Sequence, residues 1–353
     1  MERQRHNWML LLVVLALSTP GCGTFMARRM VQAPNTYPEW LAPKAPVLLA
    51  YSARFLTNFP KEFVTVGPPA AQLCYRIIEP ADYDLKVSST NWLEHGRERT
   101  KFEFHADLPA QSNRWTAAPR GTVVLLHGYG LAQFSMAPWA LELAQEGWRC
   151  VLVDLRGHGK STGKQIYYGL QEVHDLSQLL DELDREGKLK EPLAAMGESY
   201  GAAMALRWKP VEPRVQIVVA ITPYAGLSNS VMNLRDEYAA WLPKAFIKAG
   251  LKKLPSVLGT TVGELDTTTI LARCPLSAFF VAGTADKITP VADVETLRAL
   301  ASPASELVVV PGATHETVTY FFADLAPPVL TWLSEKGASG SFTNAESEVR
   351  KDH

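Results

Sequence analysis

Cysteine is scarce in this chain, and its few cysteines lie far apart. Only 4 occur among 353 residues, and no two of them form the C-x-x-C pair that zinc and redox sites use. The cysteines therefore indicate no zinc site. One disulfide among Cys74, Cys150 and Cys274 stays open in an oxidising compartment. Cys150 begins an apolar run typical of a buried strand, and this favours a free thiol that packs as a small hydrophobic group.

An excess of charge of one sign is also absent. The 35 Lys and Arg residues nearly balance the 36 Asp and Glu residues, which leaves a formal net charge of -1. Because a nucleic-acid backbone recruits clustered Lys and Arg, the sequence predicts no nucleic-acid partner. The composition is 47% hydrophobic and 20% charged, which is typical of a globular protein with a sizeable core. At this length we expect one large domain.

The uncharged apolar run near the N-terminus is too short to span a bilayer. It extends from Trp8 to Leu17, and as a helix it would rise about 15 Å, half of a hydrocarbon core of about 30 Å. Arg3 and Arg5 precede the run and small, turn-forming residues follow it, as in a secretory signal peptide. Residues 1–22 are therefore predicted to direct export.

Gly21 and Cys22, placed after this run, resemble the lipobox of bacterial lipoproteins, whose cysteine is lipidated and becomes the mature N-terminus. The family usually has leucine three positions before the cysteine, whereas Thr19 stands there and Leu17 lies two further back. Lipidation of Cys22 and ordinary cleavage nearby both stay open. The expected location is the bacterial periplasm, with attachment to the outer membrane if Cys22 carries lipid.

Residues 23–70 contain short apolar stretches without a sustained period, and we expect a tether or wrapping segment there. The β-forming residues of 73–78 and 100–105 predict antiparallel strands at the edge of a sheet. The domain itself is expected over residues 71–336. The tail, residues 337–353, is rich in Ser and Glu and is predicted to be disordered.

Continuous apolar runs that alternate with helical patterns predict an α/β fold, with a mostly parallel sheet covered by helices on both faces. The runs expected to form the parallel strands are 121–126, 150–155, 193–196, 215–221, 276–282 and 306–310. The stretch from about 226 to 272 is longer than a crossover requires. Its apolar helical face predicts either a small helical lid over a site or a helix packed on the body.

Gly197-Glu-Ser199-Tyr-Gly201 joins a predicted strand to a predicted helix. This pattern forces a sharp, strained turn, and side chains in place of the glycines would collide with the neighbouring strand and helix. The turn exposes the Ser199 hydroxyl at a helix N-terminus, where backbone N–H groups favour a developing negative charge. Ser199 is therefore the candidate nucleophile.

A glycine-bearing loop, His127-Gly-Tyr129-Gly130, directly follows the first parallel strand. Such a loop can direct a backbone N–H group at the same oxyanion as the nucleophile turn does. We expect the donors to be the amides of Tyr129 and Tyr200, while His127 is interpreted as a brace of the loop.

Together with Asp154-Leu-Arg-Gly-His158-Gly-Lys-Ser, these motifs resemble the α/β-hydrolase superfamily over roughly residues 70–335. The nearest resemblance is to its monoacylglycerol lipase and lysophospholipase branch. The resemblance implies that Asp154 and His158 are structural. It also implies a triad of Ser199, Asp286 on the loop after a late strand, and His315 after the last strand. In that triad His315 acts as general base and Asp286 orients its ring.

This interpretation predicts a serine hydrolase that cleaves carboxylic esters through an acyl-enzyme, without a metal or other cofactor. The substrate would be a small-molecule or lipid ester. No protein partner is predicted, and membrane association would come through a lipidated Cys22. Two alternatives stay open: an aminopeptidase of the same fold, which would need an acidic group for the substrate amine, and a non-catalytic binding protein. Asp236, Glu237 and Glu264 are the acidic candidates for such an amine site.

Overall fold

The computed structural model describes residues 21–37, 47–94, 97–109 and 118–349. Most of the predicted signal peptide, residues 1–20, therefore lies outside the described residues. No helix in the described ranges combines the length and the apolar character that a membrane crossing requires.

A central sheet of eight strands forms the middle layer, in the order β1-β2-β6-β5-β7-β8-β9-β10. Strands β5 to β10 are parallel to one another, and β2 runs antiparallel to β1 and β6. The α/β class and the mostly parallel sheet predicted from the sequence are thus confirmed. The strands are β1 (Glu62–Val66), β2 (Ala71–Ile78), β5 (Thr122–Leu126), β6 (Arg149–Val153), β7 (Leu193–Glu198), β8 (Val215–Ile221), β9 (Phe279–Gly283) and β10 (Glu306–Val310).

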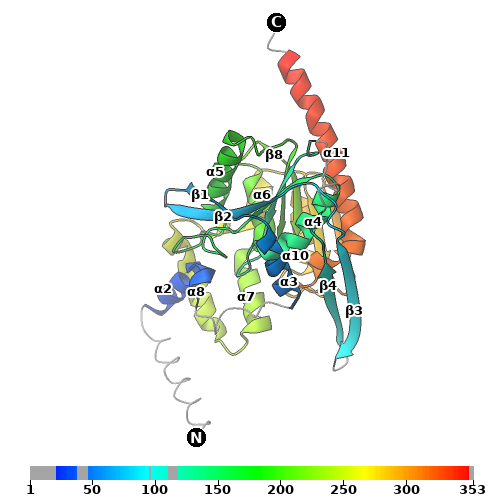
Figure 1. Ribbon diagram of the computed structural model, residues 1–353. Helices are drawn as coiled ribbons and strands as arrows, with labels where there is room; N and C mark the ends of the chain where they lie inside the picture. Colours follow the sequence, from blue (N-terminus) through cyan, green and yellow to red (C-terminus); the bar gives the residue numbers. More distant parts are fainter. Residues whose placement is uncertain (1–20, 38–46, 95–96, 110–117, 350–353) are drawn as a thin grey trace.

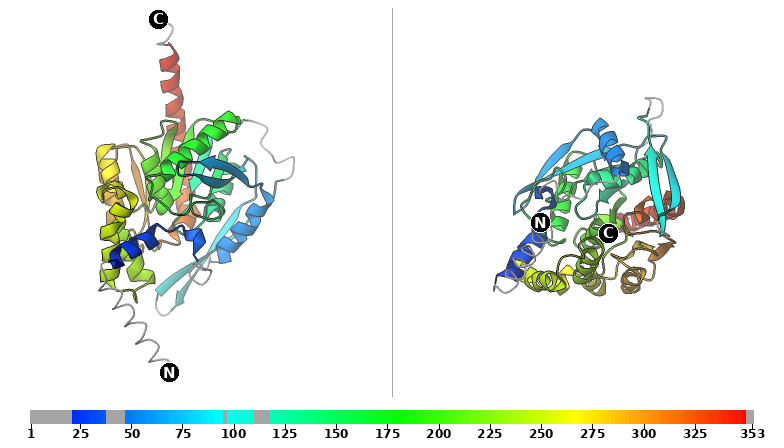
Figure 2. Two further views of the ribbon diagram at one scale, coloured as in Figure 1. Left: turned by 90° about the vertical axis from the view of Figure 1, so that its left-hand side faces the viewer. Right: turned by 90° about the horizontal axis from the view of Figure 1, so that it is seen from below.

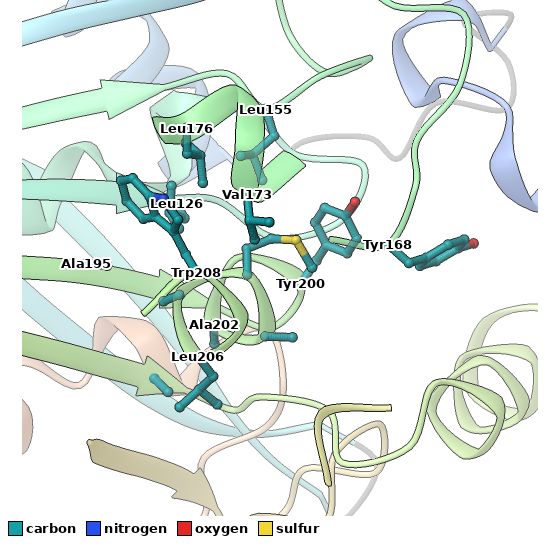
Figure 3. Packing of buried hydrophobic residues seen from close by; sticks show 14 of the residues in the cluster. Leu126, Leu155, Tyr168, Val173, Leu176, Ala195, Tyr200, Ala202, Leu206 and Trp208 are labelled. Carbon is teal, nitrogen blue, oxygen red and sulfur yellow. The ribbon is translucent and has the colours of Figure 1, made fainter. Parts of the chain in front are cut away.

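Two apolar cores lie on the two faces of this sheet, and helices cover both (Figure 1). The cluster in Figure 3 is part of the first core, in which Trp208 and Leu176 belong to helices on one face. Trp139 and Trp332 belong to the second core, on the opposite face. The covering helices are α5 (Glu172–Arg185), α6 (Tyr200–Trp208) and α10 (Val291–Leu300) on the first face, and α3 (Val47–Phe55), α4 (Ala137–Gln145) and α11 (Phe322–Val349) on the second.

The strand predicted at 100–105 exists, but it does not join the central sheet. It belongs to β4 (Arg97–His105), which pairs only with β3 (Lys86–Glu94) in a separate two-stranded hairpin. Phe102 and Phe104 of β4 instead pack on rings at the start of α11, with Phe102 and Phe321 centroids 5.1 Å apart. The edge beside β2 is already occupied by β1, so the prediction of a sheet-edge strand was wrong for β4.

The N-terminal segment has more structure than the predicted tether. Cys22 begins helix α2 (Cys22–Val31), α3 follows, and β1 supplies the edge strand of the sheet. These helices and this strand are too short to repeat a hydrophobic pattern several times, so hydrophobic periodicity in the sequence does not reveal them. Helix α2 packs on the predicted lid, since a Cβ on Gly250 would lie 2.6 Å from Met26 Cγ.

The region expected as a lid insertion is helical throughout most of its length. It contains α7 (Leu227–Tyr238), α8 (Lys244–Leu258) and α9 (Thr267–Arg273). At the other end of the chain, α11 continues to Val349, past Gly337, where the sequence predicts a disordered tail. Extending a helix requires no new nucleation, and Gly337 lies against Pro192, so the helix continues at this glycine.

All four cysteines are free thiols, and Cys150 is fully buried on β6. Burial raises the pKa of the Cys150 thiol well above its usual range. These observations agree with its interpretation as a small hydrophobic group.

Candidate active site

Ser199 occupies a strained turn between β7 and α6. Its backbone has φ 50° and ψ -110°, a conformation that side-chain-bearing residues rarely adopt. A Cβ on Gly197 would lie 2.3 Å from the Gly201 carbonyl, and one on Gly201 would lie 2.1 Å from Leu126 O. Both glycines are therefore required by close backbone packing, because a side chain at either position would collide with neighbouring backbone, as predicted from the sequence.

The structure brings Ser199, His315 and Asp286 together. Ser199 Oγ lies 2.9 Å from His315 Nε2, and His315 Nδ1 lies 2.8 Å from Asp286 Oδ2. Because the Asp286 carboxylate accepts a hydrogen bond from His315 Nδ1, Nδ1 carries the proton. Nε2 then presents a lone pair to the serine hydroxyl. This is the arrangement in which imidazole can take a proton from serine.

Three hydrogen-bond donors from the residues just after Asp286 fix its carboxylate, and they were not identified from the sequence. Its Oδ1 accepts hydrogen bonds from the backbone amides of Ile288 and Thr289, both at 2.8 Å. The Thr289 hydroxyl donates to Oδ2 at 2.8 Å. The side chain is buried, and these donors stabilise the carboxylate and fix its orientation.

The backbone amides of Tyr129 and Tyr200, predicted from the sequence as oxyanion donors, belong to two different segments of the chain. Tyr200 begins α6, and the first amides of a helix have no intrahelical acceptor. In the described part of the chain, neither the Tyr200 amide nor the Tyr129 amide donates a recorded hydrogen bond. Both are thus available to an oxyanion.

The histidines of the two glycine-bearing loops are buried and neutral. Leu155 N donates to His127 Nε2 at 3.0 Å, so His127 Nδ1 carries the proton and donates to Gly128 O at 2.8 Å. Burial lowers the pKa of His127 to about 4 and that of His158 to about 3. Asp154 accepts hydrogen bonds from two backbone amides, those of Gln133 and Lys160, both at 2.8 Å. These contacts agree with a bracing role for all three residues.

Glu198, which precedes the nucleophile, joins it to the oxyanion loop. Its Oε1 accepts a hydrogen bond from Ser135 Oγ at 2.5 Å and one from Gly128 N at 3.3 Å. The role of Glu198 was not predicted from the sequence, because its hydrogen-bond partners lie more than sixty positions away in the chain. Burial raises the pKa of the Glu198 carboxyl, while His315 and the two donors oppose the rise.

We expect Glu198→Gln to keep most of the activity and to change how stability depends on pH. The amide oxygen can still accept both hydrogen bonds, so kcat/KM should stay within about tenfold of wild type. When the pKa of a carboxyl is higher in the folded than in the unfolded protein, the free energy of unfolding falls as pH rises from the unfolded pKa to the folded pKa. Urea unfolding between pH 4 and pH 8 should show this loss in the wild type and a smaller one in the variant. Identical pH dependence in the two chains would contradict the prediction.

Glu198→Leu is the contrasting variant. It leaves the Ser135 hydroxyl and the Gly128 amide without an acceptor, and each unsatisfied buried group costs about 1 to 3 kcal/mol. We expect lower stability and lower kcat from a loosened oxyanion loop.

Known proteins resemble this chain in sequence and in fold. Residues 117–266 match the serine aminopeptidase S33 family, a range that contains Ser199 but ends before Asp286. The uncharacterized Bacillus subtilis protein YqkD is 24% identical over 208 residues, which cover 57% of this chain and 67% of that protein.

Two solved structures show the same fold at low sequence identity. An esterase from Pyrococcus furiosus superposes with a TM-score of 0.57 at 20% identity, covering 87% of this chain and 98% of its own. A candidate lipase from Acinetobacter baumannii superposes with a TM-score of 0.55 at 14% identity, covering 84% and 99% of the two chains.

Proposed function

We propose that this α/β-hydrolase cleaves carboxylic esters through an acyl-enzyme on Ser199. The observation that carries the proposal is the continuous series of hydrogen bonds from Ser199 through His315 to Asp286, beside two unpaired backbone amides. A protein that only binds its ligand does not require a histidine whose tautomer can accept the proton of a serine in a strained turn.

Each step can be assigned to an atom of this chain. His315 Nε2 takes the proton as Ser199 Oγ attacks the carbonyl carbon, and the amides of Tyr129 and Tyr200 stabilise the oxyanion. His315 then protonates the departing alcohol, which leaves the acyl group on Ser199. Water then gives a proton to His315 Nε2 while its oxygen attacks the acyl carbon. As the bond from that carbon to Ser199 Oγ breaks, His315 returns the proton to Oγ, and the acid leaves.

Ester cleavage is favoured over aminopeptidase activity because the acidic residues of the lid insertion already form ion pairs. Asp236 pairs with Lys244 at 2.9 Å, Glu237 with Lys287 at 3.1 Å, and Glu264 with Arg273 at 2.5 Å. Each candidate carboxylate for a substrate amine is therefore already paired with a cation of this chain. The aminopeptidase stays the second candidate because the matched family carries that name.

The experiment is hydrolysis of p-nitrophenyl esters from acetate to palmitate, with aminoacyl p-nitroanilides as the parallel series. We expect turnover of esters, with a chain-length optimum that reports the acyl pocket. Cleavage of the anilides alone would replace the proposal by an aminopeptidase. Failure with both series would favour a binding protein.

We also propose that the chain is exported and acts in the bacterial periplasm. The support is the sequence of residues 1–22. Cys22, the site of lipidation if it occurs, begins helix α2, and only 9% of this residue is exposed.

A further inference from the structure

Among the described residues, five of the eleven exposed large apolar side chains lie on three elements. Phe25 lies on α2, Trp92 and Leu93 lie near the free end of the β3–β4 hairpin, and Tyr238 and Trp241 lie where α7 ends and turns toward α8. Their exposed fractions are 61%, 44%, 73%, 57% and 74%, respectively. Single exposed apolar residues are ordinary on a protein surface, whereas a group of them on one side of a molecule marks an interaction site.

These elements extend to the same side of the molecule. In Figure 1 and in the left view of Figure 2, the free end of the hairpin and the turn between α7 and α8 both point to the same side of the molecule. Helix α2 lies along the same side, whereas α11 leaves the body on the opposite side. We call these five residues, with the elements that carry them, the aromatic face.

Unpaired basic residues accompany the aromatic face. Lys248, Lys252 and Lys253 of α8 and Arg28 of α2 are exposed, and none of them has a recorded ion-pair partner in the described ranges. Trp and Tyr are enriched at the boundary between lipid and water, because one end of each ring is apolar and the other polar. Lys and Arg beside them are attracted to anionic headgroups.

The aromatic face is connected to the candidate active site. Asn233 of α7 donates to Ile288 O at 3.0 Å, on the loop that carries Asp286. The segment that follows α2 reaches the oxyanion loop, where the hydroxyls of Tyr37 and Tyr129 lie 3.1 Å apart. Elements of this face therefore contact both loops that flank Ser199.

We infer that the aromatic face docks on the surface of an anionic lipid bilayer. Trp92, Tyr238 and Trp241 insert their rings at the headgroup level, and the lysines of α8 contact the headgroups. Cys22 begins α2, so a chain that carries lipid on Cys22 would meet the bilayer with this face. The inference is independent of which bond the enzyme cleaves.

Quenching by brominated lipids tests the insertion directly in the full chain. A Trp8→Phe background removes the indole of the N-terminal run, and the chain has 9 tryptophans in all. With vesicles of brominated anionic lipid, we expect measurable quenching in this background and clearly less after Trp92→Phe and Trp241→Phe are added. Equal quenching in the two chains would show that the N-terminal run alone holds the protein, and would overturn the inference.

Charge is tested by partition between vesicles of anionic and zwitterionic lipid. One membrane-facing lysine contributes about 1 kcal/mol, or roughly fivefold in affinity. Lys248→Glu with Lys252→Glu should therefore weaken partition to anionic vesicles by about 25-fold or more. Lys190→Glu is the matched control, because Lys190 is exposed and precedes β7, at the end of that strand opposite to Ser199. Equal effects in both variants, or a change only in oligomeric state, would contradict lipid docking.

Discussion

Replacing Ser199 with alanine is expected to lower kcat for ester hydrolysis by about 10⁶-fold, the loss typical of removing a triad nucleophile. The variant keeps the oxyanion amides and the substrate pocket, so a small residual rate over water should remain. It removes the only oxygen within hydrogen-bond reach of His315 Nε2 that is recorded in the described residues. A fluorophosphonate probe should label the wild type at Ser199 and leave the variant unlabelled.

The control is Ser277→Ala, which removes an exposed hydroxyl that donates to Ala304 O. It should hydrolyse esters and react with the probe as the wild type does. Because Ser199 has a positive φ, Ser199→Ala keeps the backbone strain and should unfold at nearly the same temperature as the wild type. Undiminished hydrolysis by purified Ser199→Ala would show that another residue is the nucleophile.

The turn around Ser199 was predictable because its requirements are local. Gly197 and Gly201 are fixed by backbone contacts that any residue with a Cβ would violate, and their spacing from Ser199 is visible in five letters. The order of Ser199, Asp286 and His315 was predictable from the resemblance, since each residue follows a strand whose apolar run is plain in the sequence. The parallel sheet confirms those runs.

The bracing residues could not be predicted in the same way, because they act across long separations in the chain. Ser135 and Glu198 meet only after β5 and β7 become neighbours in the sheet. Tyr37 reaches Tyr129 from a segment without any hydrophobic period. The contacts of Asp286 are the exception: they are local, and an aspartate in a turn commonly accepts a hydrogen bond from the backbone amide two residues on, as Asp286 does from Ile288.

Asp286→Asn is expected to lower kcat by about 10⁴-fold while leaving substrate binding largely intact. The change is nearly isosteric, so its effect comes from hydrogen-bond direction. Asp286 Oδ1 accepts two backbone amides, and an asparagine must keep its carbonyl oxygen there. Its NH₂ group then takes the place of Oδ2 and donates toward His315 Nδ1.

That donation reverses the tautomer of the histidine. Nδ1 must become an acceptor, the proton moves to Nε2, and Nε2–H then faces the Ser199 hydroxyl with no lone pair to take its proton. The same exchange leaves the Thr289 hydroxyl without its acceptor at 2.8 Å. Steady-state kinetics on the preferred ester should accordingly show a fall in kcat with little change in KM. NMR of the imidazole nitrogens should report the change of tautomer.

Asp293→Asn is the matched control, because Asp293 is a second carboxyl a few positions after Asp286, in the first turn of α10. Burial and the charge of Asp286 raise the pKa of Asp293, whereas His315 Nδ1 donates to Asp286. The control should keep nearly full activity. A large loss in Asp293→Asn beside an active Asp286→Asn would transfer the role of triad acid to Asp293. Loss in Asp286→Asn alone would assign the role of triad acid to Asp286, as its contact with His315 Nδ1 predicts.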